Sequence, residues 1–439
     1  MRGRYLDPHV PLLGVERAPD REAVRTAGPR VLRCPLFRLD QRNISMSTHA
    51  PARPTYAAVL RLPHARRAFA SALTARLSYG TVSLAVLLSV TRATGSYAVS
   101  GAVLSLFGAT TVFLMPLRAP LIDRYGPRRA LPPMAALYGA LLCALAALTW
   151  RPGTPAAPIA TVAGLAGACA PPLGPTMRAV WAELAPEPGM LARAYSLDGV
   201  AEELLYVSGP VLVGVLTGVA PPASGILLSA VLVVAGTAAF VTAPALPGPR
   251  PAPSGRWGGT AHGLLTPVAV AAGAGLALSG VDLLVMAFAS RHSYDTALVP
   301  WVLGALSAGS AVGGLVNGAV RWRAPARVRL GGFGVGLGLV VAVAGLAPDL
   351  WALTGAMVLA GAFIAPTLTT AYLLADELSG EGTRTRSGAW VNTAVNAGSS
   401  GGALATGLLV GRLPLGVCFA LAGATALISA VGTLRRPGR

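Results

Sequence analysis

Residues 223–243 read ASGILLSAVLVVAGTAAFVTA, a stretch of apolar and small residues without a charged side chain. A helix needs roughly 20 mostly apolar residues to cross the hydrocarbon core of a bilayer, and this stretch supplies them without interruption. Prolines bound it on both sides, at Pro221-Pro222 and at Pro244. We therefore predict a membrane-spanning helix here, and the same pattern recurs along the chain.

Comparable apolar stretches divide the chain into two sets of six. We predict spans at 69–90, 97–117, 130–150, 156–177, 194–219, 223–243, 264–290, 297–320, 329–347, 351–375, 387–410 and 414–434. Residues 1–60 are predicted as a polar tail, either disordered or preceding a true start at Met46 or nearby, and residues 244–263 as a cytoplasmic linker. The sequence thus predicts an all-α integral membrane protein of twelve transmembrane helices, with six-helix bundles at 61–243 and 264–439.

Composition agrees with a membrane protein and excludes other classes. Of 439 residues, 54% are hydrophobic and only 12% are charged, whereas soluble domains carry about 25% charged residues. The net charge of +18 comes from arginines scattered between apolar runs, not from a basic face with interleaved aromatics as nucleic-acid binding needs. We expect the lipid bilayer as a partner, no nucleic acid, and neither a metal site nor a cofactor.

The distribution of arginine tests the number of spans. Segments facing the cytoplasm carry more Lys and Arg than those outside. With both termini cytoplasmic, the outside loops hold only Arg92, Arg151, Arg291 and Arg412. The inside segments are richer, and we assign to them, among others, Arg118, Arg178 and Arg193. This alternation predicts an even number of spans in the plasma membrane, with both termini inside.

The two halves are related in sequence. Leu165-Ala-Gly-Ala168 recurs as Leu359-Ala-Gly-Ala362, an offset of 194 residues. At the same offset, Pro172 coincides with Pro366, Thr176 with Thr370, and Glu183-Leu184 with Glu377-Leu378; matches of Pro, Thr and Glu are less expected by chance here than matches of Ala and Leu. We interpret this as a parallel repeat of six spans, the arrangement of the two halves of facilitator-type transporters.

The repeat pairs unlike polar groups in the fifth span of each half. Asp198 aligns with Asn392, and Glu202 with Asn396. Residues four apart lie on one helical face, so an acidic pair in one half corresponds to an amide pair in the other. The asparagines are candidates either for binding substrate or for bonding a neighbouring helix. Spans four and ten each contain proline, at Pro172 and Pro366, and we expect both spans to be interrupted beside a cavity.

Ionisable groups inside a membrane are functional candidates because they are costly to bury. Arg76 lies roughly 10 Å into its span and Glu202 about 12 Å into its own, at 1.5 Å per residue. We predict an ion pair of Arg76 with Glu202 or Glu203, in which a carboxylate either carries a proton or only joins the two helices. Asp198 is either part of this site or a water-exposed residue at a helix start. Asp282 is either functional or a solvated carboxylate near the outer face.

The loop after the second span reads Ala119-Pro-Leu-Ile-Asp123-Arg124-Tyr-Gly126-Pro-Arg128-Arg129. It resembles the signature G-x-x-x-D-R-x-G-R-[RK] of the major facilitator superfamily, at the place in the topology where that family carries it. Ala119 replaces the leading glycine, and Pro127 is inserted before the basic pair. The resemblance implies that Asp123 holds a helix terminus of the opposite half and helps to gate alternating access. A carboxylate at a helix N-terminus is favoured by up to about 1 kcal/mol.

The fifth span contains Ser208-Gly209-Pro210-Val-Leu-Val213-Gly214. It resembles the G-P-x-x-G-G signature of the family's proton-coupled antiporters, with Val213 in place of a glycine. The fourth predicted span lacks the membrane arginine that drug–proton antiporters commonly carry. The resemblance implies an exporter of a small organic molecule, driven by proton entry, and we expect the protein to be monomeric.

Other functions remain as alternatives. A facilitator or importer of the same fold needs no proton coupling, and a non-transporting sensor needs no substrate passage. A membrane-embedded lipid-modifying enzyme would need clustered acids on a cytoplasmic loop, and no DDxxD-like run is present. An ATP-driven pump within this chain is excluded, because the phosphate-binding loop requires a lysine and the chain has none. We expect a transporter and not an enzyme.

Overall fold

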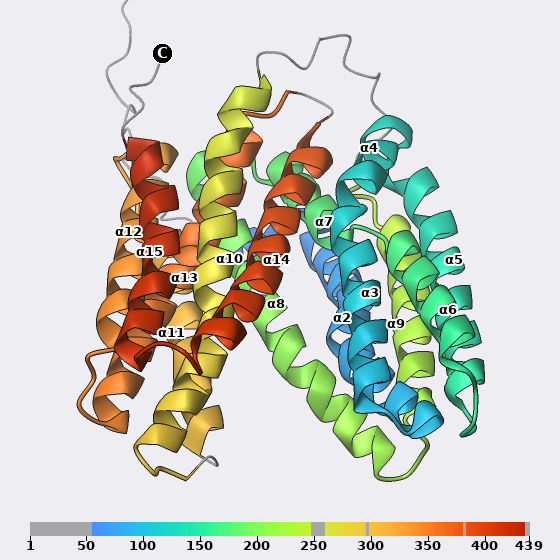
Figure 1. Ribbon diagram of the computed structural model, residues 1–439. Coiled ribbons are helices and arrows are strands. Elements are labelled where there is room, and N and C mark those ends of the chain that lie inside the picture. Colours follow the sequence, from blue (N-terminus) through green and yellow to red (C-terminus); the bar gives the residue numbers. More distant parts are fainter. Residues whose placement is uncertain (1–54, 247–259, 296–297, 381–382, 435–439) are drawn as a thin grey trace, which may run out of the picture. The chain divides into compact units, whose positions relative to one another are not determined.

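The computed structural model describes residues 55–246, 260–295, 298–380 and 383–434, which fold almost entirely into helices (Figure 1). The helices are α1 (Tyr56–Arg61), α2 (Ala65–Thr94), α3 (Tyr97–Phe113), α4 (Met115–Tyr125), α5 (Pro127–Thr149), α6 (Ala156–Cys169), α7 (Leu173–Leu184), α8 (Pro188–Thr217), α9 (Ala223–Val241), α10 (Thr260–Arg291), α11 (Val299–Ala319), α12 (Ala326–Ala344), α13 (Leu350–Glu377), α14 (Arg384–Leu409) and α15 (Leu415–Leu434). Within these ranges no β-strand occurs.

The long helices account for twelve spans. In the described ranges, ten are long and apolar enough to cross a membrane, with α6 and α7 counted together. An eleventh is formed by α3 and α4, which bend by 42° where they meet. The 26-residue α14 completes the set; arginines in its first turn and asparagines near its middle make it less apolar. The all-α, multi-pass architecture predicted from the sequence is confirmed.

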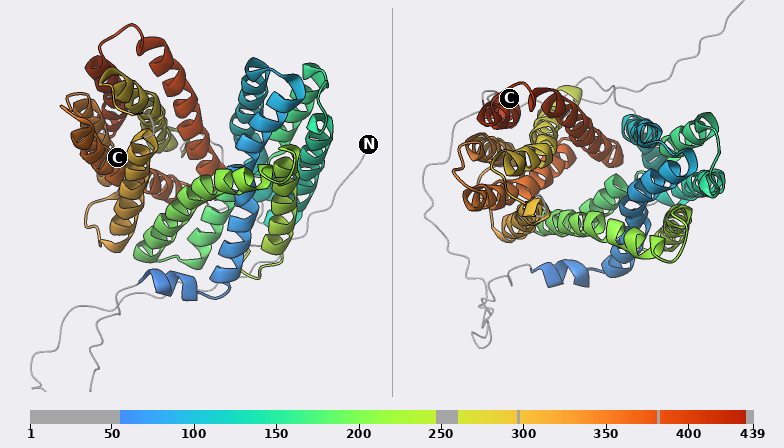
Figure 2. Two further views of the ribbon diagram at one scale, coloured as in Figure 1. Left: turned by 90° about the horizontal axis from the view of Figure 1, so that it is seen from below. Right: turned by 60° about the horizontal axis from the view of Figure 1, so that its bottom comes forward.

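Equivalent helices make equivalent contacts in the two halves. In the first half α2 packs on α8 and α9, and α5 packs on α6 and α9. In the second half α10 packs on α14 and α15, and α12 packs on α13 and α15. The further pairs α3 with α6 and α11 with α13 also correspond. Figure 2 shows α8 (green) beside α2 (blue). The contacts therefore agree with a repeat of six spans.

Several predicted boundaries were wrong. Residues 56–61, at the end of the predicted tail, form α1, and α10 begins at Thr260 inside the predicted linker. The remainder of the tail, 1–54, and linker residues 247–259 lie outside the described residues. The segment 119–125, predicted as loop, belongs to α4, so Gly126 alone separates α4 from α5. Its φ of 78° lies in the left-handed region that favours glycine.

The interrupted spans differ from the prediction in the second half. Pro171 and Pro172 lie in the break between α6 and α7, and each lacks the N–H that a helical residue donates to the carbonyl four residues earlier. In contrast, α13 runs without a break through Pro366. The prediction of a break at this position was therefore wrong, although the proline does lie within the equivalent span.

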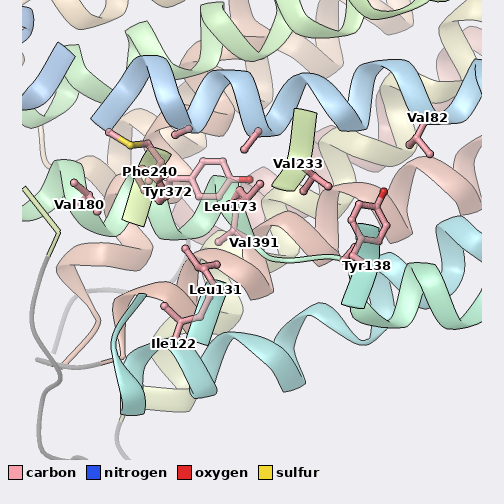
Figure 3. Packing of buried hydrophobic residues seen from close by; sticks show 14 of the residues in the cluster. Val82, Ile122, Leu131, Tyr138, Leu173, Val180, Val233, Phe240, Tyr372 and Val391 are labelled. Atoms are coloured by element: carbon pink, nitrogen blue, oxygen red, sulfur yellow. The ribbon is translucent and has the colours of Figure 1, made fainter. Parts of the chain in front are cut away.

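Buried side chains form two apolar clusters. One contains only residues of the second half, from α10 to α15. The larger one joins both halves: Figure 3 shows Leu173 and Val180 of α7 near Tyr372 of α13 and Val391 of α14. Alanine is the commonest residue in this cluster, and close packing of small residues holds helices together in lipid, where no hydrophobic driving force acts between them. The shared cluster lies around the charged residues described next.

Candidate functional site

Four charged side chains from three helices meet inside the first half. Arg76 of α2 donates through Nη1 to Asp198 Oδ1 of α8 at 2.7 Å. Its Nη2 lies 3.0 Å from Glu202 Oε2, an ion pair without hydrogen-bond geometry. Arg178 of α7 donates through Nη2 to the same Oε2 atom at 2.5 Å, and its Nε lies 3.2 Å from Asp198 Oδ2. We call these four residues the charge cluster.

The charge cluster is balanced and largely closed to solvent. Two arginines face two carboxylates, so its net charge is zero. Asp198 is completely buried, and Glu202 is the most accessible member with 24% of its side chain exposed. The water-exposed alternative for Asp198 is therefore wrong. Since removal of one partner from a buried ion pair typically costs 3–5 kcal/mol, the cluster favours a fixed connection of α2, α7 and α8.

Arg178 also contacts the second half. Its guanidinium carbon lies 3.8 Å from the centre of the Tyr372 ring of α13. A guanidinium over an aromatic face is attracted by the ring quadrupole, by about 0.5–2 kcal/mol. Within α8, the Tyr195 hydroxyl donates to the Arg178 carbonyl at 3.2 Å and holds the start of α8 against α7. Arg178 is thus the member of the charge cluster that touches both halves.

Two adjoining cavities lie against the charge cluster, between helices of the two halves. The first, about 300 Å³, is lined by residues that include Arg76, Tyr79 and Pro171. The second, about 250 Å³, is lined by residues that include Arg178, Glu203 and Tyr372. Both cavities share the lining residues Glu202, Tyr206, Asn392 and Asn396. Pockets of a few hundred Å³ that combine apolar walls with few polar groups are typical of small-molecule sites.

Glu202 of the acidic pair and both asparagines of the amide pair line these cavities from opposite halves. Asn396 Nδ2 donates to the Asn392 side-chain oxygen at 2.9 Å and to its carbonyl at 2.8 Å. Glu203, next to Glu202, accepts from the Ser310 hydroxyl of α11 at 3.1 Å. Of the sequence-predicted groups, the structure brings Arg76, Asp198 and Glu202 into contact, with Glu203 and the asparagines on the adjoining cavities.

Other predicted cavity residues lie elsewhere. Pro172 and Pro366 are buried and line neither of the two cavities, although their neighbours Pro171 and Ala365 do. Asp282 is exposed on α10 and lines neither cavity. The described residues contain no group of three or more His, Cys, Asp or Glu side chains placed to hold a metal ion.

The signature residues after the second span connect the two halves. Asp123 of α4 accepts from the backbone N–H of Thr385 at 3.2 Å and of Arg386 at 3.0 Å. Both N–H groups belong to the first turn of α14, where unpaired donors and the helix dipole favour an anion. The carboxylate therefore lies at a helix terminus of the opposite half, the position that the loop resemblance implies.

The contacts of the remaining signature residues lie within the first half. Arg128 donates to the Ala243 carbonyl after α9 at 3.1 Å. The Arg124 guanidinium lies 5.3 Å from the Tyr125 ring centre, and Arg129 is exposed. Gly126 supplies the left-handed backbone of the turn described above.

The antiporter-like segment of α8 contributes one close helix crossing. A Cβ atom on Gly209 would lie 2.3 Å from the backbone carbon of Gly80 in α2, so only glycine fits. At Gly214 nothing lies within 4 Å of such an atom, and Pro210 is exposed within the helix. Gly209 is thus explained by packing, and the structure gives Gly214 no contact that requires glycine.

Three buried arginines, Arg118, Arg178 and Arg193, were missed because they were assigned to cytoplasmic loops. Arg178 completes the charge cluster, so the expectation that the fourth span lacks an arginine was wrong. Arg118 of α4 donates to the carbonyls of Gly167 and Ala168 at 2.7 Å each and of Thr111 at 2.5 Å. These carbonyls lie at the ends of α6 and α3, where helical partners are missing. The fifth span carries three acids, Asp198, Glu202 and Glu203, against the single Arg76. This imbalance indicated a second buried arginine and could have identified Arg178.

Comparison with known families decides the class of the chain. The family model described as Major Facilitator Superfamily matches residues 68–344. The chain belongs to this superfamily. The match covers more than half of the chain and confirms the family predicted from the loop signature. The superfamily is one of transporters, so the chain is a multi-pass membrane transporter by family; its resemblance to the antiporter branch stays a prediction.

Solved structures of this superfamily fold are similar to the chain over most of its length. A bacterial homologue of the iron transporter ferroportin, in an outward-facing state, is 16% identical with a TM-score of 0.66, covering 84% of this chain and 99% of that one. The fucose:proton symporter of E. coli is 13% identical with a TM-score of 0.62, covering 85% and 99%. The human organic anion transporter MFSD10 is 16% identical, with a TM-score of 0.59 and coverage of 84% and 98%. No curated protein sequence matches the chain.

Proposed function

We propose that this superfamily member is a secondary active transporter that exports a small organic molecule from the cell in exchange for protons. It acts as a monomer in the plasma membrane with both termini in the cytoplasm. The observation that carries the proposal is the pair of adjoining cavities, lined from one half by acids of α8 and from the other by amides of α14. Unlike polar groups at equivalent positions of two half-domains give a binding site that both halves complete.

The contacts between the halves support alternating access. Asp123 bonds the start of α14, and Arg193 of α8 donates to the Ala319 carbonyl at the end of α11 at 2.9 Å. The positive-inside rule supports a cytoplasmic position for both contacts. At the other end, Val215 in the last turn of α8 is 71% exposed, and Val219, just after the helix, is 87% exposed. This combination supports an outward-facing conformation, closed towards the cytoplasm.

The direction of transport rests on the α8 signature. The Gly209-Pro210 segment resembles that of proton-coupled antiporters, and protons entering the cell then drive export. An uncoupled facilitator or importer is the second candidate, and a specific observation favours it: Glu202 is held by two arginines and is a poor proton carrier. The solved structures that resemble the chain include proteins described as a proton symporter and an organic anion transporter, and these descriptions apply to those proteins.

Growth inhibition and efflux test the proposal. The chain is produced in a host that lacks its own exporters, which is then exposed to a panel of toxic small molecules. We expect increased resistance to some of them, and a proton uncoupler should abolish release of the same compounds from loaded cells. Efflux that continues unchanged with the uncoupler would leave the facilitator as the function. The absence of any transported compound in cells and in proteoliposomes would contradict both.

A further inference from the structure

Asp198, Glu202 and Glu203 differ in whether their protonation would leave an arginine without a balancing negative charge. Asp198 and Glu202 together balance Arg76 and Arg178. A proton on Glu202 would leave one carboxylate for two buried guanidinium ions, and an uncompensated buried charge is strongly unfavourable. Glu202 therefore remains ionised throughout a transport cycle, and the charge cluster acts as a fixed element.

Glu203 has no such constraint. In the described part of the chain no arginine forms an ion pair with it, and its hydrogen bond comes from the Ser310 hydroxyl at 3.1 Å. A hydroxyl donates to a carboxylate and accepts from a carboxylic acid, so this bond can persist in both protonation states. Glu203 can therefore lose its charge without leaving a cation behind.

The surroundings of Glu203 favour a positively charged ligand. The charge cluster is neutral, so Glu203 gives the second cavity a net charge of −1. Three tyrosines line the same cavity, and aromatic faces attract cations; one of these rings already binds the Arg178 guanidinium at 3.8 Å. The side-chain oxygen of Asn392 adds an acceptor for an N–H group. The lining tyrosines are Tyr195, Tyr206 and Tyr372.

Of the helices that line this cavity, α7, α8 and α13 contribute charged or titratable groups, whereas α14 contributes asparagines and a valine. Arg178 comes from α7, Glu202 and two of the tyrosines from α8, and Tyr372 from α13. Arg76 of α2 lies behind Glu202 and is paired with it. The helix α11, which supplies Ser310, contains no charged residue. The one charge in this set without an opposite partner is Glu203.

From these observations we propose that the cavity binds a monovalent organic cation, and that Glu203 carries either this cation or a proton. This inference deepens the proposed function and depends on it for the transport step. When the ammonium group of the ligand binds, the Glu203 carboxyl releases its proton to water, and a returning proton displaces the ligand. One proton exchanges for one cation, so the exchange moves no net charge across the membrane.

Carbodiimide labelling tests which carboxyl takes a proton, and it uses the full-length wild-type chain. Dicyclohexylcarbodiimide reacts with protonated carboxyl groups in apolar surroundings, and mass spectrometry identifies the modified residue. We expect labelling of Glu203 that decreases as the pH rises, and none of Asp198 or Glu202. Asp282, an exposed carboxyl of α10 outside both cavities, is the comparison residue. Labelling of Glu202, or of Asp282 alone, would overturn the assignment to Glu203.

Probes of opposite charge test the ligand class in the same assay. Phenyltrimethylammonium is the cation, and phenylacetate is an anion of similar size. At ten times its dissociation constant, the cation should decrease labelling of Glu203 about tenfold by mass action. Phenylacetate should leave the labelling unchanged. Equal protection by the two probes, or no protection by the cation, would refute the proposed ligand class.

Transport measurements separate this inference from the proposed function. In proteoliposomes, Glu203→Gln should abolish exchange of the cation for protons, whereas Glu203→Asp should retain part of it. A valinomycin-imposed potential should leave the wild-type rate unchanged because the exchange is electroneutral. Loss of coupling in Glu202→Gln with normal coupling in Glu203→Gln would reject the inference and keep the transporter. Correct labelling without transport of any compound would reject the proposed function alone.

Discussion

Replacement of Asp123 by asparagine should change the balance between conformations. The carboxylate accepts two backbone N–H groups in the first turn of α14, at 3.2 Å and 3.0 Å. Asp123 and α14 belong to different halves, so these bonds must break when the halves separate at this end. They stabilise the conformation described here and contribute nothing to one in which α4 and α14 have moved apart. Asp123→Asn retains one acceptor oxygen and removes the negative charge.

The size of the effect follows from the bonds that are lost. A hydrogen bond to a charged group contributes about 1.5–3 kcal/mol, and an anion at a helix N-terminus about 0.3–1 kcal/mol. The asparagine loses one of two bonds and the interaction with the dipole, together about 2 kcal/mol. With tenfold for each 1.4 kcal/mol, the separated conformation should gain about thirtyfold in relative population.

Distances between spin labels measure this population. Labels on α4 and α14 are placed at Leu121, 43% exposed, and Trp390, 40% exposed, in a cysteine-free background. We expect a longer-distance component in Asp123→Asn that is far weaker in the parent. The matched control is Asp282→Asn, an equal change of charge at an exposed position away from both cavities. The same distance distribution in Asp123→Asn and the control would refute the reasoning.

Three further predictions concern stability, measured by thermal unfolding in detergent with tryptophan fluorescence. Arg178→Met should destabilise the protein by about 3–5 kcal/mol. Adding Asp198→Asn should recover part of this loss, because the charges of Arg76 and Glu202 then balance, and no recovery would contradict a charge-based role. Gly209→Ala should cost about 1–3 kcal/mol by overpacking, whereas Gly214→Ala should be neutral or stabilising by up to about 1 kcal/mol; equal effects would argue against the close crossing. Arg118→Leu should cost about 2–4 kcal/mol through its lost carbonyl bonds, and an unchanged unfolding temperature would show that water replaces them.

The spans were predictable because apolar length is a local property of the sequence. The position of Glu202 near Arg76 was also predictable, since depth along a spanning helix follows from residue number. Arg178 and Arg118 were not placed correctly, because an arginine at the end of an apolar run has the same local pattern whether it faces water or a buried partner. Only the tertiary contacts with Asp198, or with the carbonyls of α6, distinguish the two cases.

Proline gave a signal of a different kind. At the end of α6 the successive residues Pro171 and Pro172 remove two N–H donors, and the helix ends there. At Pro366 a single donor is missing, and α13 continues. Sequence alone indicates a weak point in each span, but the number of missing donors does not decide whether the helix breaks, because α5 continues through the successive Pro132 and Pro133.

The contact between Arg178 and Tyr372 has a mechanical consequence. It joins the two halves at the level of the cavities through a ring face, whose attraction depends weakly on angle and amounts to about 0.5–2 kcal/mol. The Asp123 contact, in contrast, depends on directed bonds to one helix end. When the two halves tilt relative to each other, the contact between Arg178 and Tyr372 can therefore persist. The hydrogen bonds of Asp123 to the first turn of α14 have to break.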